Sequence, residues 1–524
     1  MNRTRTVAKD AGIVMLLILA SRLLGFFRER AIADVFGVSE ATDAFRSAFL
    51  LPDFMYFLLI AGGLNAAFVP VFSEYLAKDE EESAWRLAGT FLGIIVLILL
   101  VMVALGMLFT EAFTPLVAYG YQGEQRELLA QLIRFMFPAV FFTAMAGVGM
   151  GVHRAYRSYS MPMWGPIAYN AAIIASIYLL GQRLGVVGMA WGTVAGAILN
   201  FAIQLPFVLK KAIGRFKIDL AHPGLRRVLR LMGPAVISLS IYQFNFTLNS
   251  NLASGLPEGA PTAMRIGQTI VQLPLGVFAM AIGMVLLPTL SRLIAKGEMS
   301  AFKDTFSQGL RAVYFVMIPS AVGLAVLREP LIRLLFETGE FNADDTRLSA
   351  YALLFFTVGI WAQAAIQVLT QVYYSLQETA ALVKVSVVAI VVNAALSFLL
   401  LRFTPWGLGA LALALSLTSI VNMLNYLYLL KKRIGSVDGR RLVRTVLQSA
   451  GASALMALVV WLFSTLYPQW INTSGTMGQI FHVGLSILVG AAVYLIAAKA
   501  LKMEELTFAR ALVTRDKSAA AEHA

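Results

Sequence analysis

The chain has 524 residues, of which 59% are hydrophobic and 14% are charged. Soluble domains average about 45–50% apolar and about 25% charged residues, so this composition excludes a soluble globule and indicates a membrane protein. The net charge of +13 does not by itself indicate nucleic acid, because basic residues also set the orientation of membrane proteins, and the lack of cysteine excludes disulfides and thiolate metal sites.

Apolar segments separated by short polar or Gly/Pro-containing turns follow one another along the chain. The first one carries internal arginines and lacks a small-residue cleavage site, so we predict a spanning helix there and no removed signal. Strands of an outer-membrane barrel would be about half as long and alternating. We therefore predict an all-α polytopic membrane protein with about fourteen transmembrane helices, near residues 8–33, 41–75, 86–112, 126–153, 160–182, 185–209, 231–253, 262–291, 305–326, 347–375, 380–402, 406–430, 445–467 and 476–501.

Lysine and arginine are distributed unevenly over the two sides of these predicted helices. If the N-terminus is cytoplasmic, the clusters at 210–230 and 431–444 and both chain ends fall on the cytoplasmic side. This excess predicts cytoplasmic termini. The other side keeps Arg126, Arg183, Arg328, Arg333, Arg347 and Arg402.

The two halves of the chain repeat each other. VPVFSEYLAKDE at 69–80 recurs as LPTLSRLIAKGE at 287–298, and LKKAIG at 209–214 recurs as LKKRIG at 430–435. Because six crossings return the chain to its starting side, the copies share one orientation and a pseudo-twofold axis along the membrane normal, which is a transporter layout. We predict two parallel six-helix bundles, 1–217 and 218–437, then transmembrane helices 13 and 14 at 438–503 and a cytoplasmic tail at 504–524.

Charged residues within the predicted spans need a reason, because a charge at mid-bilayer costs at least about 2.5–3.5 kcal/mol. In the structural interpretation Arg22 pairs with Glu29, while Arg28 and Arg30 reach headgroups. Their concentration in the first helix of the repeat favours a functional role instead. The second helix adds Asp43, Arg46 and Asp53, and the eighth adds Arg265.

The second half carries uncharged polar residues at helical spacing. Such amides can hold helices together, but three stripes predict a wet cavity in which arginines suit phosphate or carboxylate. The stripes are Ser238, Tyr242, Asn245 and Asn249; Arg265, Gln268 and Gln272; and Gln363, Gln367, Gln371 and Tyr374. No GxxxxGK[ST] loop and no His pair at metal-ligand spacing occurs, so we expect neither ATP hydrolysis nor a metal site.

Several runs of the sequence resemble the MurJ (MviN) family of lipid II flippases. They are SRLLGFFRERAIADVFG, ATDAF and AFVPVFSEY near the start, then PMWGPIAYN, LPLGVFAMAIGMVLLPTLS and REPLIRLLFETGEFNADDT. The resemblance covers about residues 8–435. It implies the fourteen-helix fold of the multidrug/oligosaccharidyl-lipid/polysaccharide exporter superfamily. It also implies alternating access that moves undecaprenyl-pyrophosphate-linked peptidoglycan precursor to the periplasmic leaflet of the bacterial inner membrane.

The resemblance also implies roles for individual residues. The family's two essential helix-1 arginines correspond to Arg22 and Arg28, its helix-2 aspartate to Asp43, and the serine before the first arginine to Ser21. The sequence departs from the family elsewhere, which makes the predicted cavity less cationic. The helix-2 arginine pair and glutamate correspond to Tyr56, Phe57 and Ala61; the helix-8 arginine corresponds to Thr269, with Arg265 one turn earlier as a substitute.

An ion site is implied in the same way. The acids that hold sodium in some members, in helices 7 and 11, correspond most nearly to Asn249, Asn393 and Ser397. We expect no organic cofactor, and energy from a Na⁺ or H⁺ gradient or from the membrane potential.

We therefore predict a transporter for lipid II or a related polyprenyl-linked glycolipid, with no catalytic residues and no nucleic-acid partner. The substrate-binding set is Arg22, Arg28, Arg265, Asp43, Ser21, Gln268 and Gln272. One alternative is a flippase for another polyprenyl-linked oligosaccharide, or a cation-coupled exporter of the same superfamily. Another is a scaffold in the membrane lipids that recruits cell-wall synthesis proteins and transports nothing.

Overall fold

The computed structural model describes residues 2–56, 64, 67–212, 217–435, 438–470 and 475–506, with side chains described outside 2–11, 51–53, 55–56, 233–246, 284, 379 and 468–470. Each predicted membrane segment contains an α-helix, and no strand occurs in these ranges. Ten described helices are long and apolar enough to cross a membrane, or eleven if α14 (Ala343–Thr357) and α15 (Ile360–Ser375), bent by 51°, form one span. The all-α polytopic fold is confirmed, and the count of fourteen crossings stays a prediction.

The first compact unit comprises Met1–Thr262 together with Thr338–Asp345. Its core stacks aromatic rings from several helices: Phe68 lies parallel to Phe91 with 4.9 Å between ring centroids, and Phe72 meets Trp85 edge-on. The helices are α1 (Asn2–Phe36), α2 (Glu40–Tyr56), α3 (Val69–Ala77), α4 (Glu81–Leu108), α5 (Thr110–Val117), α6 (Gly123–Ala155), η2 (Met161–Met163), α7 (Trp164–Leu184), α8 (Val186–Ala212) and α9 (Pro223–Ala253).

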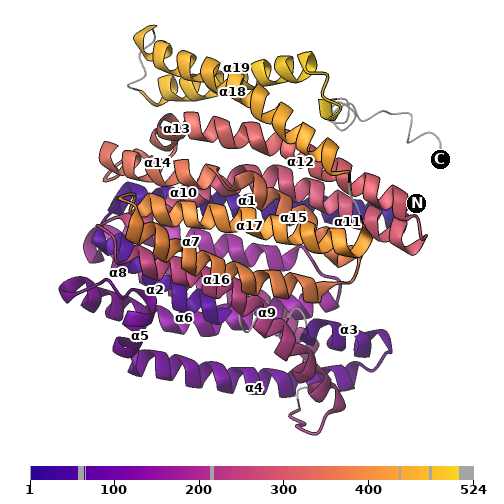
Figure 1. The fold of residues 1–524 in the computed structure, drawn as a ribbon. Coiled ribbons are helices and arrows are strands. Elements are labelled where there is room, and N and C mark those ends of the chain that lie inside the picture. Colours follow the sequence, from indigo (N-terminus) through magenta and orange to yellow (C-terminus); the bar gives the residue numbers. More distant parts are fainter. Residues whose placement is uncertain are drawn as a thin grey trace. The chain divides into compact units, whose positions relative to one another are not determined.

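Small residues bring α7 and α8 together. A β-carbon at Gly192 would lie 1.7 Å from Ser176 Oγ, and one at Gly196 would lie 2.8 Å from the Tyr169 carbonyl oxygen. Glycine is therefore required at both positions for the backbones to approach this closely, as is common in membrane helix pairs. Figure 1 shows the two helices running beside each other within this unit.

The second compact unit comprises Ala263–Glu337 and Thr346–Ala524. Its helices are α10 (Ala260–Pro274, whose first residues belong to the first unit), η3 (Leu275–Ala279), α11 (Met280–Ala295), α12 (Met299–Val326), α13 (Arg328–Phe336), α14, α15, α16 (Thr379–Phe403), α17 (Leu408–Ile434), α18 (Gly439–Trp470) and α19 (Thr476–Ala500). The π-helical turn η3 follows Pro274, whose ring cannot continue the regular hydrogen-bond ladder.

The final helix pair is attached to α12. Figure 1 shows α18 and α19 side by side near the yellow end of the colour scale. Arg311 on α12 donates to Glu504 at 2.8 Å and to Glu505 at 3.1 Å, just beyond α19. Thr445 on α18 donates to the same Glu505 carboxylate at 2.8 Å, and Tyr494 donates to the Phe315 carbonyl at 2.7 Å. The helices that lie outside the sequence repeat are thus joined to it by buried polar contacts.

The sequence repeat and the compact units divide the chain at different places. The repeat predicts a boundary at 217/218, before α9, whereas α9 packs against α2, α4 and α5 and belongs to the first unit. Locally, the matched segments end alike. Asp79 (φ 60°) and Gly297 (φ 73°) occupy the same repeat position in the left-handed region, and the amides of Glu80 and Glu298 each donate to a carbonyl five residues earlier at 3.0 Å. The pseudo-twofold symmetry of the whole halves stays a prediction.

His222 caps α9 outside the predicted spans. Its Nδ1 accepts from the Gly224 amide at 3.1 Å, and its Nε2 lies 3.0 Å from Ser83 Oγ. The capping bond requires an unprotonated Nδ1, so Nε2 carries the proton and donates to Ser83. Burial lowers the pKa of this imidazole, which keeps it neutral.

We expect acid to weaken this cap. Since the folded-state pKa is lowered, the stabilisation is complete above the ordinary His pKa of about 6.5 and is lost as the pH falls below it. His222→Asn keeps a capping acceptor but cannot be protonated. Between pH 7.5 and 5.5, the wild type should lose about 1 kcal/mol more stability than this variant, measured by thermal unfolding in detergent. Equal losses would contradict the assignment.

Candidate functional site

Arg28 on α1 is held by two oxygens from different helices. Its Nη1 donates to Asn170 Oδ1 on α7 at 3.1 Å, and its Nη2 donates to Glu29 Oε1 at 2.9 Å. Asn170 is itself fixed, because its amide nitrogen donates to the Pro166 carbonyl at 2.9 Å. The guanidinium of Arg28 is therefore positioned among polar partners inside the first unit.

Glu29 is shared by two arginines. Its second oxygen accepts from Arg46 Nη1 on α2 at 2.8 Å. The side chains of Arg28, Glu29 and Arg46 are 19%, 6% and 11% exposed. We call these three residues the arginine–glutamate triad. It holds two positive charges against one negative charge in a partly buried setting, so its net charge favours an anionic ligand.

Arg46 and Asn170 are members of this site that the predicted set omits. The sequence marked Arg46 as a charge within a span, but its partner lies on another helix, and periodicity along one helix does not reveal a contact between helices. The sequence offered one signal for Arg46, which lies three residues after Asp43 in the same predicted helix. Asn170 gave a signal as well, since it ends the run PMWGPIAYN and recurs in the repeat as Asn393.

Arg22 and Ser21 lie nearer the N-terminal end of α1 than Arg28 does. Arg22 is exposed and Ser21 is half-buried. The helix runs through Gly25 as a single element, and at 100° per residue Arg22 and Arg28 point about a third of a turn apart. The two arginines are therefore about 9 Å apart along the helix axis and do not share one face.

Asp43 is buried, with 1% exposure, and binds the beginning of α10. Its Oδ2 accepts from the Gly259 amide at 2.7 Å, and its Oδ1 accepts from the Thr262 amide at 2.9 Å and from the Thr262 hydroxyl. Gly259 precedes the helix and has no side chain with which to cap it. The carboxylate from α2 takes over that role and also matches the positive end of the helix dipole.

Removing this carboxylate should destabilise the protein. Asp43→Ala leaves the Gly259 and Thr262 amides buried without an acceptor, so we expect a loss of about 2–3 kcal/mol, seen as a lower thermal midpoint of the purified protein. Glu40→Ala is the matched control, because it removes an exposed acid one turn earlier on the same helix. Asp43→Ala with an unchanged midpoint would contradict the capping role.

Turns from distant parts of the chain meet at the same end of the first unit. The Glu340 amide donates to the Asp34 carbonyl at 2.9 Å, and Asp345 Oδ2 accepts from the Val38 amide at 3.4 Å. Gly339, with φ 57°, lies so close to Asp34 that a β-carbon would stand 2.0 Å from its carbonyl oxygen. We call residues 34–43, 254–262 and 338–345 the turn cluster. Asp43 lies within it.

The predicted polar stripe that begins at Arg265, in the eighth predicted span, lies on α10 in the second unit. Arg265 and Gln268 are half-buried, Gln272 is exposed, and Thr269, at the family's arginine position, donates its hydroxyl to the Arg265 carbonyl at 2.9 Å. On α15, Gln363, Gln367 and Gln371 are half-buried and Tyr374 is exposed. Both stripes thus keep polar groups accessible within their unit.

The residues predicted to form an ion site belong to different compact units. Asn249 on α9 is 2% exposed, whereas Asn393 and Ser397 on α16 are fully buried, and Asn393 donates to Thr418 Oγ1 at 3.4 Å. Across the described residues, no group of three or more His, Cys, Asp or Glu side chains could hold a metal. The side chains of Tyr56, Ser238, Tyr242 and Asn245 and the residues Phe57 and Ala61 lie outside the described part of the chain.

A family model described as lipid II flippase MurJ matches residues 32–480. The chain belongs to the MurJ family. Curated members similar to it include a probable lipid II flippase MurJ of Bdellovibrio bacteriovorus, 29% identical over 96% of each chain. Another is the lipid II flippase MurJ of Burkholderia cenocepacia, 29% identical over 88% of this chain and 90% of that one.

Solved structures support the same assignment. A lipid II flippase MurJ in an inward closed conformation matches this MurJ-family chain with TM-score 0.78 and 25% identity, over 93% of this chain and 98% of the other. A multidrug resistance MATE transporter of the MOP superfamily, inward-facing, matches with TM-score 0.67 and 14% identity over 81% of this chain, and this likeness concerns the fold alone. The resemblance read from the sequence is confirmed.

Proposed function

We propose that this chain is a flippase that moves lipid II across the bacterial cytoplasmic membrane by alternating access. It is a transporter and not an enzyme. The observation that carries the proposal is a partly buried, net cationic triad in a chain that matches the MurJ family over most of its length. Lipid II carries a pyrophosphate, and guanidinium groups bind phosphate oxygens through paired charge-assisted hydrogen bonds.

The triad would work by exchanging partners. In the described state Glu29 occupies one side of both Arg28 and Arg46. An arriving pyrophosphate offers these arginines more negative charge than Glu29 alone and would neutralise the excess positive charge. Arg22, Ser21, Arg265, Gln268 and Gln272 would then contact the rest of the headgroup, while the prenyl tail stays in lipid. Glu29 would regain both arginines after release, which restores the arrangement of the empty site.

Asp43 is proposed to act in gating. Its three hydrogen bonds hold the start of α10 within the turn cluster, at the end that the basic residues predict to be periplasmic. Any movement of the start of α10 away from α2 would require these bonds to break, so they would resist that step of the cycle. Asp43 would thus set the balance between states without touching the pyrophosphate.

Energy and surroundings complete the proposal. A Na⁺ or H⁺ gradient or the membrane potential would drive the cycle, with Asn249, Asn393 and Ser397 as the neutral candidates for an ion site. Both termini would be cytoplasmic, fourteen helices would cross the inner membrane, and the chain would meet membrane lipids and cell-wall synthesis proteins.

One assay tests the proposal. In cells depleted of their own lipid II flippase, labelled lipid II should become accessible at the outer leaflet when this chain is expressed and not with an empty vector. If Arg22→Ala and Arg28→Ala variants at normal membrane levels still restored accessibility, the site assignment would be wrong. Failure of the wild-type chain to restore lipid II accessibility would contradict the proposal.

The departures from the family pattern favour a second candidate. The resemblance implies that Tyr56, Phe57 and Thr269 correspond to arginines in many members, so the site would carry fewer cations than theirs. A polyprenyl-linked oligosaccharide with fewer carboxylates than lipid II would suit it. Rescue of a strain lacking a flippase for such a glycan, together with failure in the lipid II assay, would favour this candidate.

A further inference from the structure

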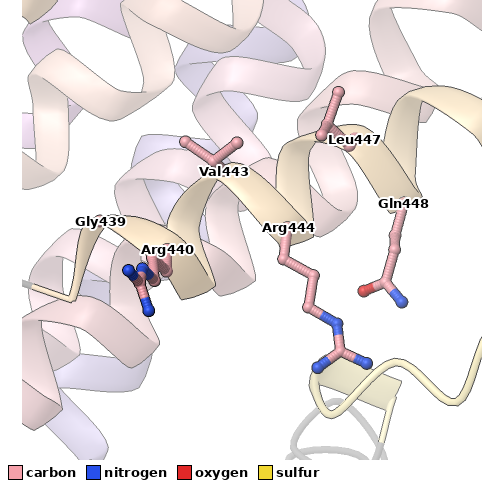
Figure 2. Close-up of a pocket in the computed structure, with 6 residues that line it drawn as sticks. All are labelled: Gly439, Arg440, Val443, Arg444, Leu447 and Gln448. Carbon is pink, nitrogen blue, oxygen red and sulfur yellow. The ribbon is translucent and has the colours of Figure 1, made fainter.

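Two oxygens from different helices converge on the guanidinium of Arg28. Its Nη1 donates to Asn170 Oδ1 on α7 at 3.1 Å, and its Nη2 donates to Glu29 Oε1 on α1 at 2.9 Å. Other arginines lack such a setting. At the start of α18, where a single helix lines an open hollow, Figure 2 shows the side chains of Arg440 and Arg444 pointing apart. Arg28 thus occupies a position that oxygens from two helices define.

Both oxygens are held in place without Arg28. The Asn170 amide nitrogen donates to the Pro166 carbonyl at 2.9 Å, so turning the amide over would set two carbonyl oxygens against each other. Glu29 is held through its other oxygen, which accepts from Arg46 Nη1 at 2.8 Å. If Arg28 moved away, both acceptors would therefore keep their positions. We call Asn170 Oδ1 and Glu29 Oε1 the oxygen pair.

The oxygen pair is costly to leave without a positive partner. Glu29 is 4% exposed and Asn170 is 7% exposed. A buried acceptor that loses a charged donor bears the full cost of its desolvation. Any event that draws Arg28 away therefore favours the entry of another positive group between the two oxygens. Carboxylate and amide oxygens are ligands that hard metal cations prefer.

Charge balance indicates which cation suits this position. The triad has one net positive charge, because Arg28 and Arg46 share the single carboxylate of Glu29. The pyrophosphate of a lipid-linked substrate carries two ionised oxygens, so the site becomes net negative when it binds. One monovalent cation restores neutrality, whereas a divalent cation would leave an excess positive charge. Uncompensated charge is costly in a partly buried site.

We propose that the oxygen pair is a binding site for a monovalent metal cation. Arg28 occupies this site in the described state, and Na⁺ or K⁺ enters it when Arg28 turns to the pyrophosphate, a movement that rests on the proposed function. Water completes the shell of the cation, since the Arg28 side chain is 19% exposed. The site uses none of the residues predicted to form an ion site, which are Asn249, Asn393 and Ser397.

The first test opens the site by removing the arginine. Full-length Arg28→Ala, purified in detergent, should gain about 2 °C in thermal midpoint relative to the wild type when NaCl or KCl replaces choline chloride at constant ionic strength. Measuring against the wild type cancels the effect of any other ion site. Guanidinium chloride at about 10 mM should stabilise Arg28→Ala and not the wild type, because it restores the group that was removed.

Two variants serve as controls for this test. Arg30→Ala removes the same charge from the same helix and keeps Arg28 in place, so it should behave like the wild type. Adding Asn170→Leu to Arg28→Ala removes one of the two oxygens with little change of volume, and it should abolish both gains. No gain in Arg28→Ala, an equal gain in Arg30→Ala, or a gain that survives Asn170→Leu would each overturn the proposal.

A second measurement uses the wild type and separates this site from the proposed function. Lipid II in detergent should bind about 10-fold more tightly in NaCl or KCl than in choline chloride, and Asn170→Leu should bind it equally in both. Equal affinity in the wild type would overturn the proposal, as would a dependence on pH alone, which would assign the charge to protonation of Glu29. If lipid II did not bind at all, the proposed function would be contradicted, and the response of Arg28→Ala alone would decide the cation site.

Discussion

Arg28→Gln should lower outward transport of lipid II about 100-fold while the protein still reaches the membrane. The substitution removes the charge but leaves an amide donor, so we expect the loss of one charge-assisted hydrogen bond to the phosphates, worth about 1.5–3 kcal/mol. Arg28→Lys should be intermediate, because an ammonium cannot reach two acceptors in the planar geometry that joins Asn170 and Glu29. The measurement is the initial rate at which labelled lipid II appears at the outer leaflet.

Arg30→Gln is the matched control for Arg28. It removes the same charge two residues further along the same helix and leaves the triad intact. We expect a rate within about twofold of the wild type, since a single cation that lies outside the triad contributes little to a specific site. Equal effects of the two substitutions would mean that the helix needs charge for insertion and that Arg28 has no particular role.

Glu29→Gln should be the most destabilising single change in the triad. It removes the carboxylate that both Arg28 and Arg46 contact, and breaking a buried ion pair from one side costs about 3–5 kcal/mol. The purified protein should unfold several degrees lower. Adding Arg46→Gln to Glu29→Gln should restore part of the lost stability, because it removes one of the two positive charges.

A double-mutant cycle measures the coupling energy between Glu29 and Arg46. The combined variant should lose less stability than the two single losses together, with a coupling of about 1–3 kcal/mol. Strictly additive losses would show that Glu29 and Arg46 do not interact. The cycle also separates stability from transport, because Arg46→Gln alone keeps the Arg28–Glu29 pair and should mainly weaken binding of the pyrophosphate.

Hydropathy predicted the helices because each span must bury its backbone polar groups within one helix, so long apolar runs specify helices almost alone. The same argument failed for short helices, and α5 and α13 were merged into their neighbours or passed over. The concentration of charge in the first helix also favoured a functional role there, and the family resemblance placed that role on Arg22 and Arg28. In both cases the information was local.

Contacts between distant segments were beyond the reach of the sequence. Asp43 reads as a charge in a span, but its partners Gly259 and Thr262 lie more than 200 residues later. The pairing of Glu29 with Arg46, where Arg22 was the candidate from spacing along α1, likewise depends on how α1 and α2 pack. Helical periodicity fixes which face a residue occupies, and it leaves open which helix that face meets.

The contact between Arg311 and Glu504–Glu505 has a consequence for the order in which the protein is made. Arg311 emerges from the ribosome 193 residues before its first carboxylate partner. At about 5–20 residues per second, the guanidinium waits for about 10–40 s without these partners while the later helices insert. The unit that contains α12 can therefore reach its final packing only after Glu504 and Glu505 have been made. A stop codon or fusion junction before Glu504 would remove both carboxylates that Arg311 contacts, so tags belong after residue 506.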